Sequence, residues 1–119
     1  MEAKVDMKLA RLGPRGHPFV LSTRVENGTA QITVSGEIDI ATASTLEELL
    51  IGTMAGSGTA TEVDLANVSF MDASGLTALI RADNKARDAG GRLHLSHVPE
   101  RVSRLLKISH LDRRFSVRT

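Results

Sequence analysis

A hairpin signal followed by a regular alternation of strand-like and helix-like segments constrains this chain most strongly. Asn27-Gly28 separates two stretches, 19–26 and 29–35, in which apolar and polar residues alternate. Both central positions of a type I′ turn need positive φ, which this pair tolerates. After residue 35, helix and strand patterns alternate, which requires right-handed helical crossovers between parallel strands. The sequence therefore predicts an α/β fold with a small mixed sheet, antiparallel at an N-terminal hairpin and mostly parallel elsewhere.

Hydrophobic spacing places the remaining elements. Helical spacing predicts helices over 41–54, 74–89 and 100–108, and strand patterns cover 61–66, 92–97 and 114–117. Residues 67–72 are expected to form a short connection. Val63-Asp64-Leu65 and Leu93-His94-Leu95 alternate between apolar and polar residues, whereas strands buried on both faces are apolar throughout. Helices are therefore expected mainly on one face of the sheet.

The first 18 residues are expected to form a flexible extension, and the folded domain is expected to cover 19–119. Residues 13–18, with the sequence Gly-Pro-Arg-Gly-His-Pro, break any regular element. Residues 1–12 are either a loose tail or a short docking helix with Val5, Leu9 and Leu12 near one face. An isolated helix of about 12 residues is only marginally stable in water.

Composition excludes several classes of function. The 119 residues carry a net charge of +1, far from the basic footprint of a nucleic-acid-binding domain, and aromatic residues are only 3%. The absence of cysteine excludes disulfides and thiolate metal sites. No apolar run approaches the roughly 18 residues of a membrane span, and no secretory signal is visible. We expect no cofactor, metal, nucleic acid or membrane partner, and a cytoplasmic location.

The connection 67–72 and the helix after it carry the first candidate site. Function in parallel sheets concentrates at the carboxyl ends of strands. Ser74 is expected to be the N-cap of the helix, with its hydroxyl accepting from the N–H of Leu76 or Thr77. A phosphoryl group there would add roughly −1.5 to −2 charge beside Asp72, and a helix N-terminus tolerates such charge. Phosphorylation could then weaken a docked partner without changing the fold.

A second candidate segment is Gly36-Glu37-Ile38-Asp39. If the strand before it lies parallel to 61–66, both loops open at one edge and Glu37 and Asp39 lie near Ser74. Asp39 could equally serve only to cap the helix near Ala41.

Two residues that follow Ser74 also have alternative interpretations. Gly75 either leaves room for a kinase or allows tight packing at the helix start. Leu76 is either a core residue or an exposed docking contact.

Three segments together resemble a known family. Gly36-Glu37-Ile38-Asp39 and Val63-Asp64-Leu65 are followed by residues 68–76, Val-Ser-Phe-Met-Asp-Ala-Ser-Gly-Leu. Their order and spacing are similar to those of anti-sigma factor antagonists, which are bacterial STAS domains. The resemblance runs from about residue 19 to 117. The Asp-x-Ser-Gly-Leu block after a strand is its most specific part.

This resemblance implies a partner-switching cycle. The unphosphorylated domain would bind an anti-sigma factor that is also a serine kinase, and so release a sigma factor. The kinase would then phosphorylate Ser74 and dissociate, and a serine phosphatase would reset the cycle, as in stress-response regulation of transcription. Ala73 stands where many relatives carry Ser or Thr. The implied partner-binding residues are Gly36, Glu37, Asp39, Asp72, Ala73, Gly75, Leu76 and Thr77. The alternative is a STAS scaffold or sensor module in a signalling assembly without a phosphorylation cycle.

Enzymatic interpretations of Ser74 lack their partner residues. A serine hydrolase needs a base beside the hydroxyl, and no motif ties a histidine to Ser74. The Gly-x-Ser-x-Gly pattern is absent, as is a phosphate-binding loop with its lysine. His94 and His97 are three residues apart around a strand end and are expected to face opposite sides. We therefore predict a binding protein with no catalytic residues.

Overall fold

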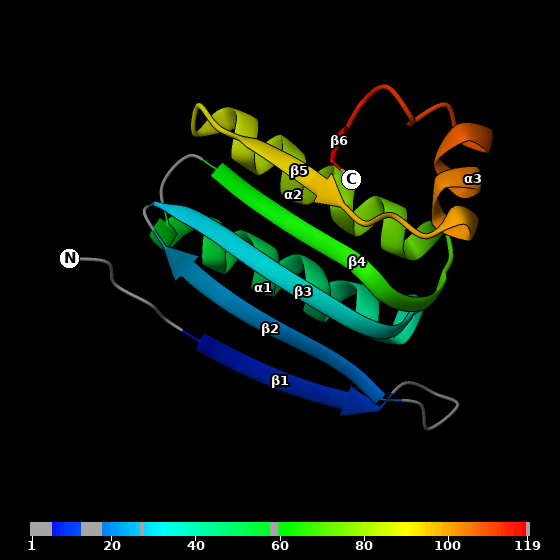
Figure 1. Cartoon of the computed structure of the whole chain (residues 1–119), viewed down its shortest axis with the longest axis horizontal. Helices are drawn as coiled ribbons and strands as arrows, with labels where there is room; N and C mark the ends of the chain where they lie inside the picture. The colour runs from blue at the N-terminus through cyan, green and yellow to red at the C-terminus, as the bar shows by residue number, and fades with distance from the viewer. Residues whose placement is uncertain (1–5, 13–17, 27, 58–59, 119) are drawn as a thin grey trace.

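A computed structural model of the chain describes residues 6–12, 18–26, 28–57 and 60–118. All described strands join one sheet, in the order β1-β2-β3-β4-β5-β6. The elements in chain order are β1 (Asp6–Leu12), β2 (Pro18–Glu26), β3 (Thr29–Ile38), α1 (Ile40–Ser57), β4 (Ala60–Met71), α2 (Ala73–Asp88), β5 (Arg92–Ser96), α3 (Glu100–Ile108) and β6 (Ser116–Arg118). Figure 1 shows the strands lying side by side in this order.

The predicted hairpin and the predicted strand directions are confirmed. β2 pairs antiparallel with β3, and Glu26 lies opposite Thr29. Gly28 has φ of 75°, in the left-handed region that such turns require. From β3 onward all pairings, β3 with β4, β4 with β5 and β5 with β6, are parallel. The fold is therefore the mixed α/β sheet that the alternation of patterns predicted.

The two longer helices cover the same face of the sheet, as predicted. Each crossover advances to the next strand in the same direction, and right-handed crossovers then place their helices on one side. In Figure 1, α1 and α2 lie together behind the sheet, while α3 lies beyond the carboxyl end of β5. The largest fully buried side chains form the core: Phe19, Leu21, Ile32, Val34, Ile38, Leu46, Leu50, Val63, Leu65, Leu79, Leu93 and Leu95.

β4 is longer than the sequence suggested. The residues expected to connect strand and helix, 67–72, continue β4 as far as Met71. The register between β3 and β4 shifts twice, between Thr33 and Ser35 and between Gly36 and Glu37. Each shift inserts one extra residue on β4, so its buried positions no longer alternate strictly. The bulges thus interrupt the alternation of buried and exposed residues along β4, although the strand continues to pair with β3.

The N-terminal segment is also different from the expectation. Residues 6–12 are neither a tail nor a helix, because they form β1 and pair antiparallel with β2, with Leu9 opposite Leu21. The sequence Asp-Met-Lys-Leu-Ala-Arg-Leu alternates charged and apolar residues over its first four positions, which is a strand pattern. Residues 1–5 and 13–17 lie outside the described part of the chain.

Candidate functional site

Two helices start next to each other at the carboxyl end of the central strands. Ile38 and Met71 are paired in register at the ends of β3 and β4. The N–H of Asp72 donates to the carbonyl of Ile38 over 3.3 Å. α1 follows from Ile40 and α2 from Ala73. The prediction that both loops open at the same edge of the sheet is therefore confirmed.

Asp39 caps α1, as one of its two interpretations predicted. Its Oδ1 accepts from the N–H of Ala41 over 3.0 Å and of Thr42 over 3.3 Å. The buried Thr42 hydroxyl accepts from the Asp39 N–H over 3.0 Å and donates to the Glu37 carbonyl over 3.0 Å. This network satisfies backbone groups that the helix start leaves without partners. It also fixes the Asp39 carboxylate at the sheet edge.

The cap of α2 is Asp72 and not Ser74, so that prediction is wrong. Asp72 has the extended backbone of an N-cap, and its Oδ1 accepts from the Ser74 N–H over 2.9 Å. Ser74 is therefore the second residue of the helix. Its side chain is half-exposed, and no described residue forms a hydrogen bond with its hydroxyl. The start of α2 is therefore capped by Asp72, and the Ser74 hydroxyl is not needed for this cap.

Of the remaining predicted site residues, two are buried and the others reach the surface. Leu76 is 4% exposed, and Gly75 is also buried. Their burial favours packing roles over contact with a partner. Ala73 and Thr77 are exposed, and the Thr77 hydroxyl donates to the Ala73 carbonyl over 3.0 Å. Gly36 and Glu37 at the end of β3 are half-exposed.

Gly75→Ala is expected to destabilise the domain by about 1–3 kcal/mol, the usual cost of overpacking. A Cβ at this position would lie 2.6 Å from Met71 Cγ and 2.9 Å from Ile38 Cγ2. Urea denaturation measures the effect. Gly52→Ala in α1 is the matched control, because nothing lies within 4 Å of its added Cβ. That variant is expected to gain roughly 0.5–1 kcal/mol. Equal stabilisation by both substitutions would contradict the packing role of Gly75.

Sequence reasoning missed a groove that starts beside Ser74. It holds about 270 Å³ between α1 and α2. Its lining residues are Ile40, Ala43, Ser44, Glu47, Ser74, Thr77, Ala78 and Arg81. Ile40 at the start of α1 is 80% exposed, so it places a large apolar side chain on the rim of the groove. Ile40, Ser44 and Glu47 are spaced so that they share one face of α1. The sequence does not show that α2 packs beside this face and so forms the groove.

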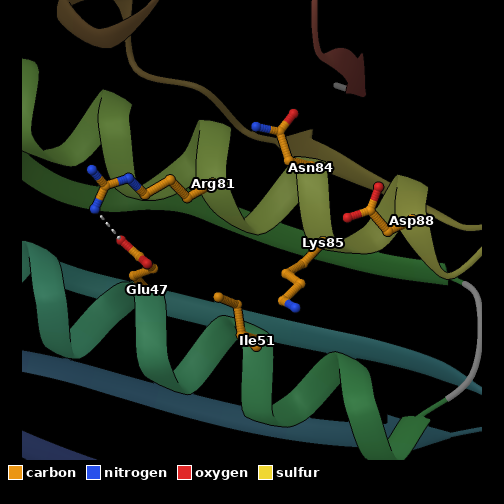
Figure 2. Close-up of a pocket in the computed structure, with 6 residues that line it drawn as sticks. All are labelled: Glu47, Ile51, Arg81, Asn84, Lys85 and Asp88. Carbon is orange, nitrogen blue, oxygen red and sulfur yellow. Dashed lines mark ion pairs between the residues drawn. The ribbon is translucent and has the colours of Figure 1, made fainter.

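Among the described residues, an ion pair joins α1 and α2 across this groove. Arg81 Nη1 of α2 lies 3.5 Å from Glu47 Oε1 of α1 (Figure 2). Both residues also line a second hollow of about 290 Å³, which continues along the helices past Ile51, Asn84, Lys85 and Asp88. The two hollows thus form one continuous groove, the α1–α2 groove, which runs from Ser74 toward the end of α2.

The described residues contain no group of three or more His, Cys, Asp or Glu side chains arranged to hold a metal ion. None of the described helices has the length and apolar character needed to cross a membrane.

Comparisons with known proteins place the chain in a family. Residues 21–119 match the family model described as Mlab, STAS domain. The anti-sigma-B factor antagonist of Bacillus subtilis is 35% identical over 81 residues, which are 68% of this chain and 73% of that protein. The chain belongs to the anti-sigma factor antagonist family of STAS domains. Family membership confirms the predicted binding protein, because these proteins are regulatory antagonists and not enzymes.

Solved structures agree with this family. The anti-sigma factor antagonist from Mycobacterium paratuberculosis is 26% identical, with a TM-score of 0.73, over 90% of this chain and 89% of that chain. The Bacillus cell fate determinant SpoIIAA in its phosphorylated form is 18% identical, with a TM-score of 0.61, over 95% of this chain and 92% of that chain. At this lower identity the likeness concerns the fold alone.

Proposed function

We propose that this STAS domain antagonises an anti-sigma factor and is switched off by phosphorylation of Ser74. The observation that carries the proposal is that Ser74, in the first turn of α2, is partly exposed and that its hydroxyl has no hydrogen-bond partner among the described residues. Asp72, and not this hydroxyl, caps the helix. A kinase can therefore modify the oxygen without removing a contact that the fold needs.

Electrostatics supplies the reason for dissociation. A phosphoserine carries roughly −1.5 to −2 charge at neutral pH. At residue 74 this charge would stand beside the Asp72 carboxylate, whose Oδ1 already accepts from the Ser74 N–H. A partner that docks over this surface must remove water from the new dianion, which costs several kcal/mol unless a cation compensates it. Binding is therefore lost while the helix remains folded.

The docking surface consists of the exposed residues around the two helix starts. Ala73, Ser74 and Thr77 present one side of α2, and Ile40 presents an apolar contact at the start of α1. Glu37 and Asp39 border the same edge of the sheet. An apolar centre with a polar rim is the usual anatomy of a protein–protein interface. Gly75 and Leu76 support this surface from beneath.

The partner in this proposal is an anti-sigma factor with serine kinase activity. Relatives of this chain are antagonists of anti-sigma-B and anti-sigma-F factors, and a relative with the same fold, SpoIIAA, has a phosphorylated form. In the unphosphorylated state this chain would hold the anti-sigma factor and free a sigma factor in the cytoplasm. A serine phosphatase would restore the binding state, as expected for control of a stress response.

Phosphorylation mapping tests this function. The partner is captured from the native host with the Ser74→Ala variant as bait and then incubated with the parent protein and ATP. Mass spectrometry is expected to find one phosphoryl group, on the peptide that contains Ser74. Ser44→Ala is the matched control, because Ser44 is exposed in the same groove and its loss should leave the label unchanged. A captured kinase that labels another residue, or none, would contradict the proposal and favour the scaffold alternative.

A further inference from the structure

The groove beside Ser74 contains a cation placed to receive a phosphoryl group. Ser74 and Arg81 line the same hollow of about 270 Å³, and Arg81 is the one cationic residue among those that line it. Arg81 follows Ser74 by seven positions, nearly two helical turns, so both lie on the same side of α2 about 10 Å apart along its axis. The hollow is thus continuous between the hydroxyl and the guanidinium.

Arg81 extends in the direction of Ser74. In Figure 2 its side chain runs along α2 away from Asn84 and Asp88, toward the end of the helix that carries Ser74. Long side chains on helices generally lean toward the N-terminus in this way. A phosphoryl group on Ser74 adds oxygens beyond the serine oxygen and shortens the remaining gap.

The present partner of Arg81 is a weak competitor. Its contact with Glu47 spans 3.5 Å, and the two side chains are 65% and 26% exposed. Ion pairs this exposed contribute from nothing to about 1 kcal/mol. A phosphate carries more charge than a carboxylate and can take two parallel hydrogen bonds from one guanidinium. Arg81 should therefore exchange Glu47 for the phosphate when both are available.

The start of α2 cannot bind the phosphate equally well. The Ser74 N–H is already bonded to Asp72 Oδ1 at 2.9 Å, and that carboxylate repels a second anion. The phosphate is consequently directed away from the cap and into the α1–α2 groove. Thr77 on the next turn also lines the hollow, but its hydroxyl donates to the Ala73 carbonyl.

We propose that this groove is the binding site for the phosphoryl group of phosphorylated Ser74, held by Arg81 in place of Glu47. The proposal rests on the proposed function, because it requires phosphate on Ser74. Arg81 offsets only part of the phosphate charge, and the Glu47 carboxylate loses its cation on the facing helix, so the surface still gains the full negative charge of the phosphoryl group. The change in charge then extends two turns from Ser74 and alters more of the surface that faces a partner.

The test uses protein in which phosphoserine is placed at residue 74 during translation, so that no kinase is needed. The pKa of the phosphate is followed by phosphorus NMR during a pH titration. All proteins carry phosphoserine at residue 74. The proton affinity of the phosphate is expected to be about threefold lower with Arg81 present than in Arg81→Gln. The effect is modest because the pair of phosphate and Arg81 is exposed to water. Glu47→Gln removes the competitor and is expected to lower the proton affinity further.

Lys85→Gln is the matched control, because Lys85 is a cation one turn further along α2 that lines only the second hollow. It should titrate like the parent. Equal titration of the parent and Arg81→Gln, or an equal effect of Lys85→Gln, would overturn the inference. Failure of the host kinase to label Ser74 would instead overturn the proposed function, and the titration would remain a separate result.

Discussion

Ser74→Asp is expected to weaken binding to the anti-sigma factor about a hundredfold, which corresponds to roughly 3 kcal/mol. The substitution places a permanent carboxylate on the surface around the two helix starts, next to that of Asp72. A docked partner would have to remove water from both charges. Isothermal titration calorimetry with the purified partner measures the loss. Ser109→Asp is the control, because Ser109 is an exposed serine that caps the end of another helix, α3, and lines neither hollow of the α1–α2 groove.

Ser74→Ala gives the complementary result. It removes only the hydroxyl, which has no partner among the described residues, so binding is expected to stay within about threefold of the parent, or roughly 0.7 kcal/mol. Addition of ATP should release the parent from its kinase but not the alanine variant. If both variants bound like the parent before and after ATP, Ser74 would have no role in the switch.

Asp83→Ala is expected to cost about 2–3 kcal/mol of unfolding free energy. Asp83 is 1% exposed on α2, and its Oδ1 accepts from the Leu93 N–H of β5 over 3.3 Å. Its Oδ2 lies 3.0 Å from Arg87 Nε and 3.4 Å from Arg114 Nε. Removing the carboxylate leaves a buried N–H without its acceptor. Both arginines remain partly exposed to water, so the cost stays below that of a fully buried pair.

Asp83→Asn separates the two contributions. The amide oxygen can still accept from Leu93 while the negative charge is lost, so this variant should lose less stability than Asp83→Ala. Urea denaturation of the three proteins measures the difference. An alanine variant within about 0.5 kcal/mol of the parent, the range typical of neutral surface changes, would show that Asp83 does not anchor α2 to β5.

The sequence was most informative where its patterns are regular. The first strand of the hairpin and the helix predicted over 74–89 lie within one residue of the observed elements, and the second hairpin strand begins where predicted but runs three residues further, to Ile38. Strict alternation failed in β4, because the bulges after Thr33 and Gly36 shift its register. β1 was missed because its alternation of charged and apolar residues covers only four positions, the lower limit at which such a pattern indicates a strand.

The candidate site was predicted only in part, for a geometric reason. Residue types alone offered the capping role of Asp39, which the structure shows, as one of two interpretations, and they made Ser74 a candidate. They assigned the cap of α2 to Ser74 and not to Asp72, because both residue types are good N-caps and lie two residues apart. The α1–α2 groove with its Glu47–Arg81 pair was beyond prediction, since it forms only when two helices distant in sequence pack together.

The most direct measurement compares the chain with phosphoserine at position 74 against the unmodified chain, using one preparation of the anti-sigma factor. Dissociation constants and thermal unfolding are recorded on the same samples. The account predicts binding at least about a hundredfold weaker, or roughly 3 kcal/mol, with one cooperative unfolding transition at nearly the same temperature. Unchanged binding, or weaker binding accompanied by loss of the cooperative transition, would contradict a switch that acts through surface charge.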